Sequence, residues 1–299
     1  MFFCGKVTEK RRNSHNALNK KTTMRGVFCC FSRFSLCILI LNEYLCGVNW
    51  IIMSCILHIE TSTNVCSVAV SEDAQVIFEQ DNLAELASID DRKARQGAAV
   101  LLAPYVRDAL SFADSHAIPI DAVAVSSGPG SYTGLRIGVS EAKGVAYGLN
   151  VPLIEVPTLK LMCVPLLLYR EDIISPPSEE LGEVLLCPMI DARRMEVYAA
   201  VYNRALKPVR DVQPDIVTED TYKELLDRHI IYFFGDGSAK CKEVIKHPNA
   251  RFIDDIVPLA KHMAPLAEMA HARGEFVDTA YFEPFYLKEF QATVAKRPF

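Results

Sequence analysis

The fold is decided by the stretch ILHIETSTNVCSVAV at residues 56–70. Its first part, Ile56–Ile59, is a short apolar run that ends at an acid, Glu60, and leads into a polar turn. The second part, Val65–Val70, is rich in β-branched residues, which are common in strands. After another turn, Gln75–Gln80 predicts a third strand. The segment therefore begins with three strands in a meander.

The same order returns in the second half of the chain. Val184–Ile190 predicts a strand, Asp191 stands at its end, Arg193 and Arg194 occupy a tight turn, and Met195–Tyr202 predicts the next strand. Strand, terminal acid, turn and strand thus occur twice, which indicates two related lobes. Mixed strands and helices with a repeated opening favour an α/β fold with duplicated mixed sheets flanked by helices, of the two-lobe actin-like or ribonuclease H-like class.

Apolar spacing and turn residues place the other elements. Helices are predicted over residues 98–112, 135–147, 158–169 and 260–273, and strands over 122–125, 151–156 and 230–234. Gly148 is expected to end one helix and Thr158 to cap the next. The expected divisions are an extension at 1–52, a first lobe at 53–170 with residues 258–290 packing back on it, and a second lobe at 171–257.

A glycine-rich loop, SSGPGSYTG at residues 126–134, lies between a predicted strand and a predicted helix. The amides at such a helix start can bind phosphate. The loop is not a Walker loop, because no G-K-[ST] follows, and Gly134 comes one residue late for a dinucleotide fingerprint. Pro129 also removes an N–H that would face a pyrophosphate. A tight structural turn and a ligand-binding loop both remain open.

The acids at the ends of the two equivalent strands, Glu60 and Asp191, form a second candidate site. In actin-like folds such acids can hold a metal–nucleotide complex between the lobes, but each acid could instead cap its own turn. The candidate cofactor-binding residues are Glu60, Gly128, Gly130, Ser131 and Asp191. They define an alternative function, an actin-fold ATPase or kinase that uses these acids and the Gly128–Gly134 loop.

Histidine and cysteine spacing predicts no metal site. We also expect no cofactor and no catalytic residue, although Ser–His–Asp and Cys–His arrangements need no sequence proximity and stay open. No H-x-x-x-H or H-E-x-x-H pattern occurs, so no helix presents two imidazoles to a metal. His262 and His271 are expected to be solvated on an exposed helix. The five cysteines after Met53 are scattered in apolar patterns and are expected to be reduced thiols in the core.

Charge is divided unevenly along the 299 residues. Residues 1–52 hold eight basic and two acidic residues, a net of +6, whereas the rest holds 24 basic and 35 acidic residues, a net of −11. An acidic body argues against a broad surface that grips nucleic acid by itself. Within the extension, the longest uncharged piece is Phe34–Asn42, far shorter than the ~20 residues of a membrane helix. We therefore expect an unstructured or wrongly assigned extension, a start at Met53, no membrane contact and a cytoplasmic protein.

Four segments carry a resemblance to a known family. They are ILHIETS at 56–62, SGPGSYTGLRIG at 127–138, IDARRMEVY at 190–198 and EPFYL at 283–287. In this order they resemble the TsaB family of tRNA threonylcarbamoyladenosine biosynthesis proteins. The resemblance covers nearly all of residues 54–290 and leaves residues 1–52 outside it.

The resemblance implies a non-catalytic scaffold subunit, similar to TsaD but without its paired-histidine metal motif. Such a subunit binds and activates TsaD for N6-threonylcarbamoylation of the adenosine beside the anticodon in tRNA. The implied partners are TsaD in a heterodimer, the ATPase TsaE, tRNA indirectly through the complex, and a second copy of the chain when it is free.

The family docks through the helices of its first lobe. The residues that the resemblance places in this interface are Leu101, Leu102, Tyr105, Val106, Leu135, Val139 and Ala142. A histidine that the family often carries near Gln96–Ala98 is missing here, which leaves the detail of the interface open.

Overall fold

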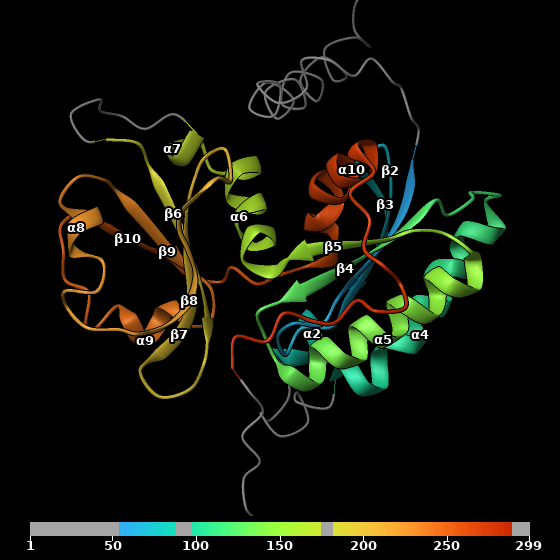
Figure 1. The fold of residues 1–299 in the computed structure, drawn as a ribbon, viewed down its shortest axis with the longest axis horizontal. Helices are drawn as coiled ribbons and strands as arrows, with labels where there is room; N and C mark the ends of the chain where they lie inside the picture. Colours follow the sequence, from blue (N-terminus) through green and yellow to red (C-terminus); the bar gives the residue numbers. More distant parts are fainter. Residues whose placement is uncertain (1–53, 88–96, 175–181, 289–299) are drawn as a thin grey trace, which may run out of the picture. The chain divides into compact units, whose positions relative to one another are not determined.

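Two five-stranded mixed sheets with the same strand order form the framework of the protein (Figure 1). The structure is a computed structural model that describes residues 54–87, 97–174 and 182–288. Sheet A has the order β3-β2-β1-β4-β5, and sheet B has the order β8-β7-β6-β9-β10. In each sheet the central strand pairs antiparallel with one neighbour and parallel with the other. The duplicated, helix-flanked actin-like fold predicted from the sequence is confirmed.

The bounds of the elements are as follows. Sheet A contains β1 (Cys55–Glu60), β2 (Ser67–Glu72), β3 (Gln75–Asp81), β4 (Ala122–Gly128) and β5 (Leu153–Pro157). Sheet B contains β6 (Leu185–Asp191), β7 (Glu196–Asn203), β8 (Pro208–Ile216), β9 (Ile231–Phe234) and β10 (Ala250–Ile253). The long helices are α4 (Gly97–Ser115), α5 (Tyr132–Leu149), α6 (Thr158–Tyr169) and α10 (Ala264–Arg273). Short helical turns are α2 (Leu83–Leu86), α7 (Glu171–Ile174), α8 (Lys223–Leu226), α9 (Ser238–Cys241) and the 3-10 turn η1 (Ala260–Met263).

Strand alternation gives sheet A two apolar faces. Leu57 and Ile59 lie in the cluster that α4 and α5 cover. Ile56, one residue out of phase, lies instead in the cluster with Met263 and Ala267, from η1 and α10. Figure 1 shows α4 and α5 on one side of this sheet and α10 on the other. Helices on both faces explain why the central strands are apolar almost throughout.

Helix α6 is buried against both sheets. Its Leu161 packs in the cluster of sheet A with Met263, whereas Met162, Cys163 and Leu166 pack in a cluster with strands of sheet B. A helix with neighbours on opposite sides needs apolar residues all round. This requirement explains the run of apolar residues in the sequence of α6.

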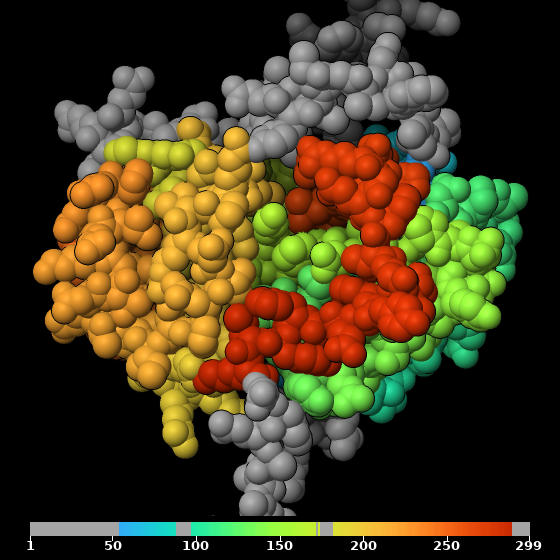
Figure 2. Space-filling view, in the orientation of Figure 1, coloured from blue at the N-terminus to red at the C-terminus, as the bar shows by residue number. Residues whose placement is uncertain are grey.

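The C-terminal segment after α10 runs along the surface of sheet A, where it is coloured red in Figure 2. The Val277 N–H donates to the Leu153 carbonyl at 2.9 Å, and the Phe285 N–H donates to the Ser127 carbonyl at 2.7 Å. Lys143 of α5 donates to the Ala280 carbonyl at 2.9 Å. The segment is therefore tied to β5, β4 and α5. The predicted division of the chain at 170 and 257 stays a prediction.

Several predicted helix ends were wrong. Helix α5 begins at Tyr132 rather than at 135, because Ser131 caps it. Gly148 lies inside this helix, and Asn150 ends it with a φ of 56°, a left-handed conformation that asparagine tolerates well. Thr158 was expected to cap α6, but Pro157 holds the cap position and no side-chain cap bond forms. The Thr158 hydroxyl is buried without a hydrogen-bond partner among the described residues.

Two strands were not predicted from the sequence. The residues of β8 include Pro208, Pro214 and several charged side chains, which weaken the alternation that marks a strand. The strand lies at an edge of sheet B, where proline is tolerated because one row of amides is unpaired. Strand β10, only four residues long at the opposite edge, is too short to give a period.

The predicted extension at residues 1–52 lies outside the residues that the structure describes, and so does its apolar stretch. Within residues 54–87, 97–174 and 182–288, no helix combines the length and the apolar character needed to cross a bilayer.

Candidate functional site

Glu60 ends β1 as a fully buried carboxyl group. Its Oε1 accepts a hydrogen bond from the Ser62 N–H at 2.5 Å, so the side chain caps its own turn. Its Oε2 has no hydrogen-bond partner among the described residues. Burial raises the pKa of Glu60 to about 7, and polar groups of Ser62 and Ser126 partly oppose that rise. The group is therefore partly protonated at neutral pH.

Asp191 holds the equivalent place at the end of β6 and makes the equivalent bond. Its Oδ1 accepts from the Arg193 N–H at 3.2 Å. In contrast to Glu60, Asp191 is exposed, and it forms an ion pair with Lys240. The Lys240 ammonium also donates to the Glu196 carbonyl at 2.6 Å. The turn-capping alternative thus accounts for both acids.

Glu60 and Asp191 therefore offer little to a metal–nucleotide complex in this conformation, since one is enclosed and the other is neutralised by a lysine. Across the described ranges, no group of three or more histidine, cysteine or acidic residues is placed to hold a metal ion. A role for either residue in binding a cofactor stays a prediction.

The glycine turn after β4 packs directly on the turn after β1. The Ser131 N–H donates to the Ser62 carbonyl at 2.6 Å, and the Ser131 hydroxyl accepts from the Gly134 N–H at 3.3 Å. Gly128 has a φ of +109°, a conformation that favours glycine. A Cβ atom at Gly130 would overlap the Ser62 carbonyl oxygen.

The first two turns of α5 continue this close packing. A Cβ at Gly134 would overlap the Thr61 carbonyl oxygen, and one at Gly138 would overlap the Thr61 hydroxyl. The Thr61 hydroxyl donates to the Gly134 carbonyl at 2.8 Å. The glycines that suggested a phosphate loop are therefore explained by internal contacts, as expected for the structural-turn alternative. The structure does not test whether the turn also binds a ligand.

Sheet B repeats the same device on a smaller scale. Gly235 follows β9 with a φ of +100°, and a Cβ there would overlap the Met189 carbonyl oxygen. A Cβ at Gly237 would lie 2.9 Å from the Ile190 carbonyl carbon. The Ser238 hydroxyl then donates to the Gly235 carbonyl at 2.7 Å at the start of α9. The duplication thus extends from strand order to turn chemistry.

Six of the seven residues expected in the partner interface lie in the core of sheet A. They are Leu102, Tyr105, Val106, Leu135, Val139 and Ala142, each at most 7% exposed; Leu101 is partly buried against the same cluster. These side chains face the protein's own sheet and cannot form its surface. The docking of these helices on TsaD stays a prediction, but it must use their other faces.

The outward faces of α4 and α5 carry small residues and a few large apolar ones. Val100 is 65% exposed and Tyr147 is 84% exposed. A Cβ added at Gly144 or Gly148 would meet no atom within 4 Å. Gly144, Val100 and Tyr147 were not among the residues expected in the interface, although Gly144 lies inside the helix predicted over residues 135–147.

Two histidines, His58 and His262, are buried outside the glycine turn and the capped acids. His58 is fully buried, its Nε2 lies 2.7 Å from the Ser71 hydroxyl, and burial lowers its pKa to about 3. His262 was expected to be solvated, which is wrong. Burial lowers the pKa of His262 to about 4, because η1 packs against β1 and β2 rather than facing water.

The described cysteines are all free and buried, at positions 55, 66, 163, 187 and 241. Burial raises the pKa of each thiol, so they stay protonated and unreactive. The prediction of core thiols is confirmed for these five.

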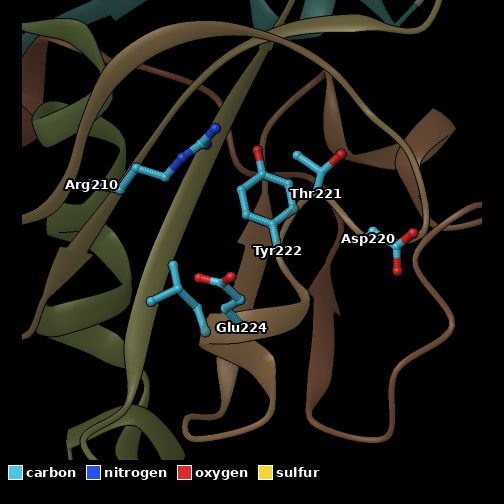
Figure 3. Close-up of a pocket in the computed structure, with 6 residues that line it drawn as sticks. Arg210, Asp220, Thr221, Tyr222 and Glu224 are labelled. Carbon is cyan, nitrogen blue, oxygen red and sulfur yellow. The ribbon is translucent and has the colours of Figure 1, made fainter.

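A pocket of about 280 Å³ lies beside α8 in the part of the molecule around sheet B (Figure 3). Its wall includes Arg210 and Tyr222, whose polar ends point toward each other in Figure 3. Both bind the buried Asp215: Arg210 donates to its two oxygens at 2.5 and 2.6 Å, and the Tyr222 hydroxyl donates at 2.6 Å. The Asp215 carboxylate is thus neutralised by Arg210 and hydrogen-bonded by Tyr222. No sequence pattern had indicated this cluster.

Comparison with known proteins identifies relatives over most of the chain. The family model for TsaD, tRNA N6-adenosine threonylcarbamoyltransferase, matches residues 92–296. The tRNA threonylcarbamoyladenosine biosynthesis protein TsaB of Escherichia coli (strain K12) is 30% identical over 242 residues, covering 78% of this chain and 94% of that protein. TsaB of Bacillus subtilis (strain 168) is 26% identical over 194 residues, covering 64% and 75% of the two chains.

Solved structures give the same result. A Pseudomonas aeruginosa protein described as similar to peptidase YEAZ superposes with a TM-score of 0.61 at 26% identity, covering 79% of this chain and 100% of that one. YeaZ from Pseudomonas aeruginosa superposes with a TM-score of 0.56 at 26% identity and the same coverage. From the curated relatives, the TsaD family match and these structures together, the chain belongs to the TsaB family of tRNA threonylcarbamoyladenosine biosynthesis proteins.

Proposed function

We propose that this protein acts in tRNA threonylcarbamoyladenosine biosynthesis as a non-catalytic subunit that binds and activates TsaD. The names of its TsaB relatives support the pathway, and the match to the TsaD family model supports a common ancestry with the proposed partner. The outward face of α5 is the observation that carries the proposal furthest. TsaE and tRNA, the latter reached through the complex, are proposed as further partners.

Gly144 has no role inside the folded chain. A glycine within a helix is about 1 kcal/mol less favourable than alanine. At Gly134 and Gly138 the chain needs that glycine, because Thr61 occupies the space of a Cβ. At Gly144 the space is open, so an alanine would fit and would stabilise the monomer. This open, flat surface is consistent with a protein partner that packs against the helix at Gly144.

The residues around Gly144 fit a protein partner. Ser140 and Gly148 lie one helical turn away on either side, so the exposed stripe is narrow and smooth. Tyr147 stands beside it at 84% exposure, and Val100 on the neighbouring α4 is 65% exposed. Small residues let two helix backbones approach closely, and exposed aromatic groups are typical anchors of protein interfaces.

The acids support a role without catalysis. The alternative ATPase or kinase would use Glu60 and Asp191, but Glu60 is enclosed and Asp191 is paired with Lys240. We therefore propose no second function.

The test is reconstitution of adenosine modification on an unmodified tRNA. Purified TsaD, TsaE and the enzyme that forms threonylcarbamoyl-AMP are combined with or without this protein, and mass spectrometry of the digested tRNA detects the modified nucleoside. We expect product only when the protein is present. Equal product in its absence would overturn the proposal.

A variant pair tests the surface. Gly144→Leu places a bulky side chain on the exposed face of α5. Ala272→Leu is the control, because it places the same side chain at an exposed position of α10, a helix that packs on the opposite face of sheet A. We expect Gly144→Leu to weaken TsaD binding by about tenfold or more, with unchanged or higher thermal stability. Ala272→Leu should bind TsaD as the wild type does. Equal binding by both variants would remove α5 from the interface.

A further inference from the structure

In the turn between β6 and β7, two arginines adopt the left-handed backbone conformation that favours glycine and asparagine. Arg193 has a φ of 69° and Arg194 a φ of 52°. Two consecutive left-handed residues form the kind of hairpin turn in which asparagine and glycine are strongly preferred. An arginine in this region crowds its Cβ against the backbone. The backbone of the turn therefore does not explain the choice of arginine.

The charges around the turn leave both guanidinium groups without a counter-ion. Asp191 pairs with Lys240, and Glu196 pairs with Lys288. Arg193 and Arg194 are exposed, and neither side chain makes a hydrogen bond or ion pair with another residue in the described ranges. Two positive charges thus project from a chain whose residues after 52 carry a net charge of −11.

The equivalent turn of sheet A shows that the fold does not require these charges. There, Thr61 and Ser62 follow Glu60, and both are fully buried beneath the glycine turn and α5. In sheet B, Arg193 and Arg194 are instead exposed, and the yellow hairpin stands out from the surface at the lower edge of Figure 2. The two turns share the hydrogen bond that caps the acid, and neither that bond nor the left-handed backbone of the second turn calls for arginine side chains.

We propose that Arg193 and Arg194 bind phosphate groups of the tRNA that the complex modifies, an inference that rests on the proposed function. Guanidinium groups donate two parallel hydrogen bonds to a phosphate. A hairpin tip with two free guanidinium groups is large enough to contact a backbone phosphate, whereas a stable protein interface needs about 800 Å² on each side. On an acidic protein, such a tip gives a polyanion a local positive contact that partly offsets the repulsion from the rest of the surface.

The test separates conformational strain from binding. In the variant Arg193→Asn with Arg194→Gly, both charges are removed and the turn gains the residues that its backbone favours. We expect a higher melting temperature than the wild type together with weaker tRNA binding. The matched control, Arg228→Gln with Lys246→Gln, removes two exposed charges near the opposite end of the sheet B strands.

Binding is measured with the full chain, alone and with TsaD, by fluorescence anisotropy on a labelled unmodified tRNA at several salt concentrations. We expect the turn variant to bind about tenfold more weakly at low salt, and its slope of log Kd against log salt to fall by between about one and two. The control should keep the wild-type affinity and slope to within about twofold.

Each contrary outcome has a definite meaning. Unchanged tRNA binding by the turn variant would overturn the inference. Unchanged tRNA binding together with weaker association with TsaD would assign the turn to a protein interface instead. In the modification assay, we expect the turn variant to have a higher KM for tRNA. Its rate of modification should return to the wild-type rate when tRNA is saturating. Failure of the wild-type chain to support modification would contradict the proposed function, independently of the turn.

Discussion

The turn after β1 and the turn after β6 are equivalent in the fold and opposite in chemistry. In both, the last residue of the central strand is an acid that accepts a hydrogen bond from the amide two residues on. In sheet A the acid, Glu60, is enclosed and its pKa is raised. In sheet B the acid, Asp191, is exposed and bound to Lys240. Duplication has kept the hydrogen bond that caps each acid, although only the second turn has left-handed residues, at Arg193 and Arg194. The cover over each turn decides what the carboxyl group does.

The two glycine turns teach the complementary lesson. Gly128 and Gly235 adopt nearly the same backbone conformation, with φ of +109° and +100°. A Cβ at Gly235 would overlap the Met189 carbonyl of the central strand, whereas a Cβ at Gly128 would lie 2.7 Å from the Phe285 carbonyl of the C-terminal segment. The conformation is common to both halves, but the neighbour that enforces it differs.

Alanine substitution at these glycines is expected to have the largest effect. Gly235→Ala should lower the free energy of unfolding by about 3 kcal/mol, because it combines a left-handed φ with overlap against a central strand. Gly128→Ala should cost about 2 kcal/mol, since the surface segment at Phe285 can move more readily than β6. Urea unfolding followed by circular dichroism measures both.

The control for this comparison is Gly274→Ala. Gly274 also has a positive φ, +66°, but a Cβ there would meet no atom within 4 Å. It should therefore cost only about 1 kcal/mol, the strain of the conformation alone. Equal losses at Gly235 and Gly274 would show that overlap with Met189 contributes nothing.

Replacing each acid with its amide should give effects of opposite sign. Glu60→Gln should raise the free energy of unfolding at pH 8 by about 2 kcal/mol, because the folded protein no longer has to bury a charge. Asp191→Asn should lower it by about 0.5 kcal/mol, since a partly exposed ion pair with Lys240 is lost. Denaturant titrations of both variants at pH 8 and pH 4.5 check the prediction.

The direction of the pH effect follows from the raised pKa of Glu60. The unfolded chain ionises this group near its ordinary value of 4.5, and the folded chain does so only near 7. The wild type therefore loses stability as pH rises from about 4.5 to about 7. The advantage of Glu60→Gln should vanish at pH 4.5. An advantage that is equal at both pH values would show that Glu60 does not titrate differently in the two states.

His58 in β1 is matched in β6 by Met189, so the two central strands also differ in a buried titratable group. The pKa of His58 is lowered from 6.5 to about 3, so its contribution is intact above pH 6.5 and is lost as pH falls toward 3. Between pH 7.5 and 5.5, His58→Met should gain about 1 kcal/mol relative to the wild type. Parallel pH dependence in the wild type and His58→Met would contradict the prediction.

Much of the framework could be predicted because its signals are local. The run of apolar residues that ends at Glu60, repeated at Asp191, gave both sheets their central hairpins. The edge strand β8 could not be predicted in this way. It pairs with one neighbouring strand and borders solvent on its other side, so its residues do not show a regular apolar pattern. His262 was misplaced because a ten-residue pattern does not show which side of a helix is covered.

The proposed interface shows a more general limit. Apolar residues at helical spacing mark the side of a helix that meets its own sheet. Leu102 and Val139 were expected in the partner interface, but they lie in the core of sheet A. A surface that only a partner covers leaves a different trace, namely residues that the monomer does not need. We propose that Gly144 in α5 and the arginines of the β6–β7 turn are of this kind. The open space at Gly144 and the left-handed backbone of the arginines are visible only in the three-dimensional structure.

Helix α6 places a restriction on how the two halves can change. Leu161 packs in the core of sheet A, and the next residue, Met162, packs in the core of sheet B. A substitution that improves the fit to one sheet changes the rotation of the helix and disturbs the other. The duplicated halves are therefore not exchangeable modules, and mutations accepted on either side of α6 must be accepted by both.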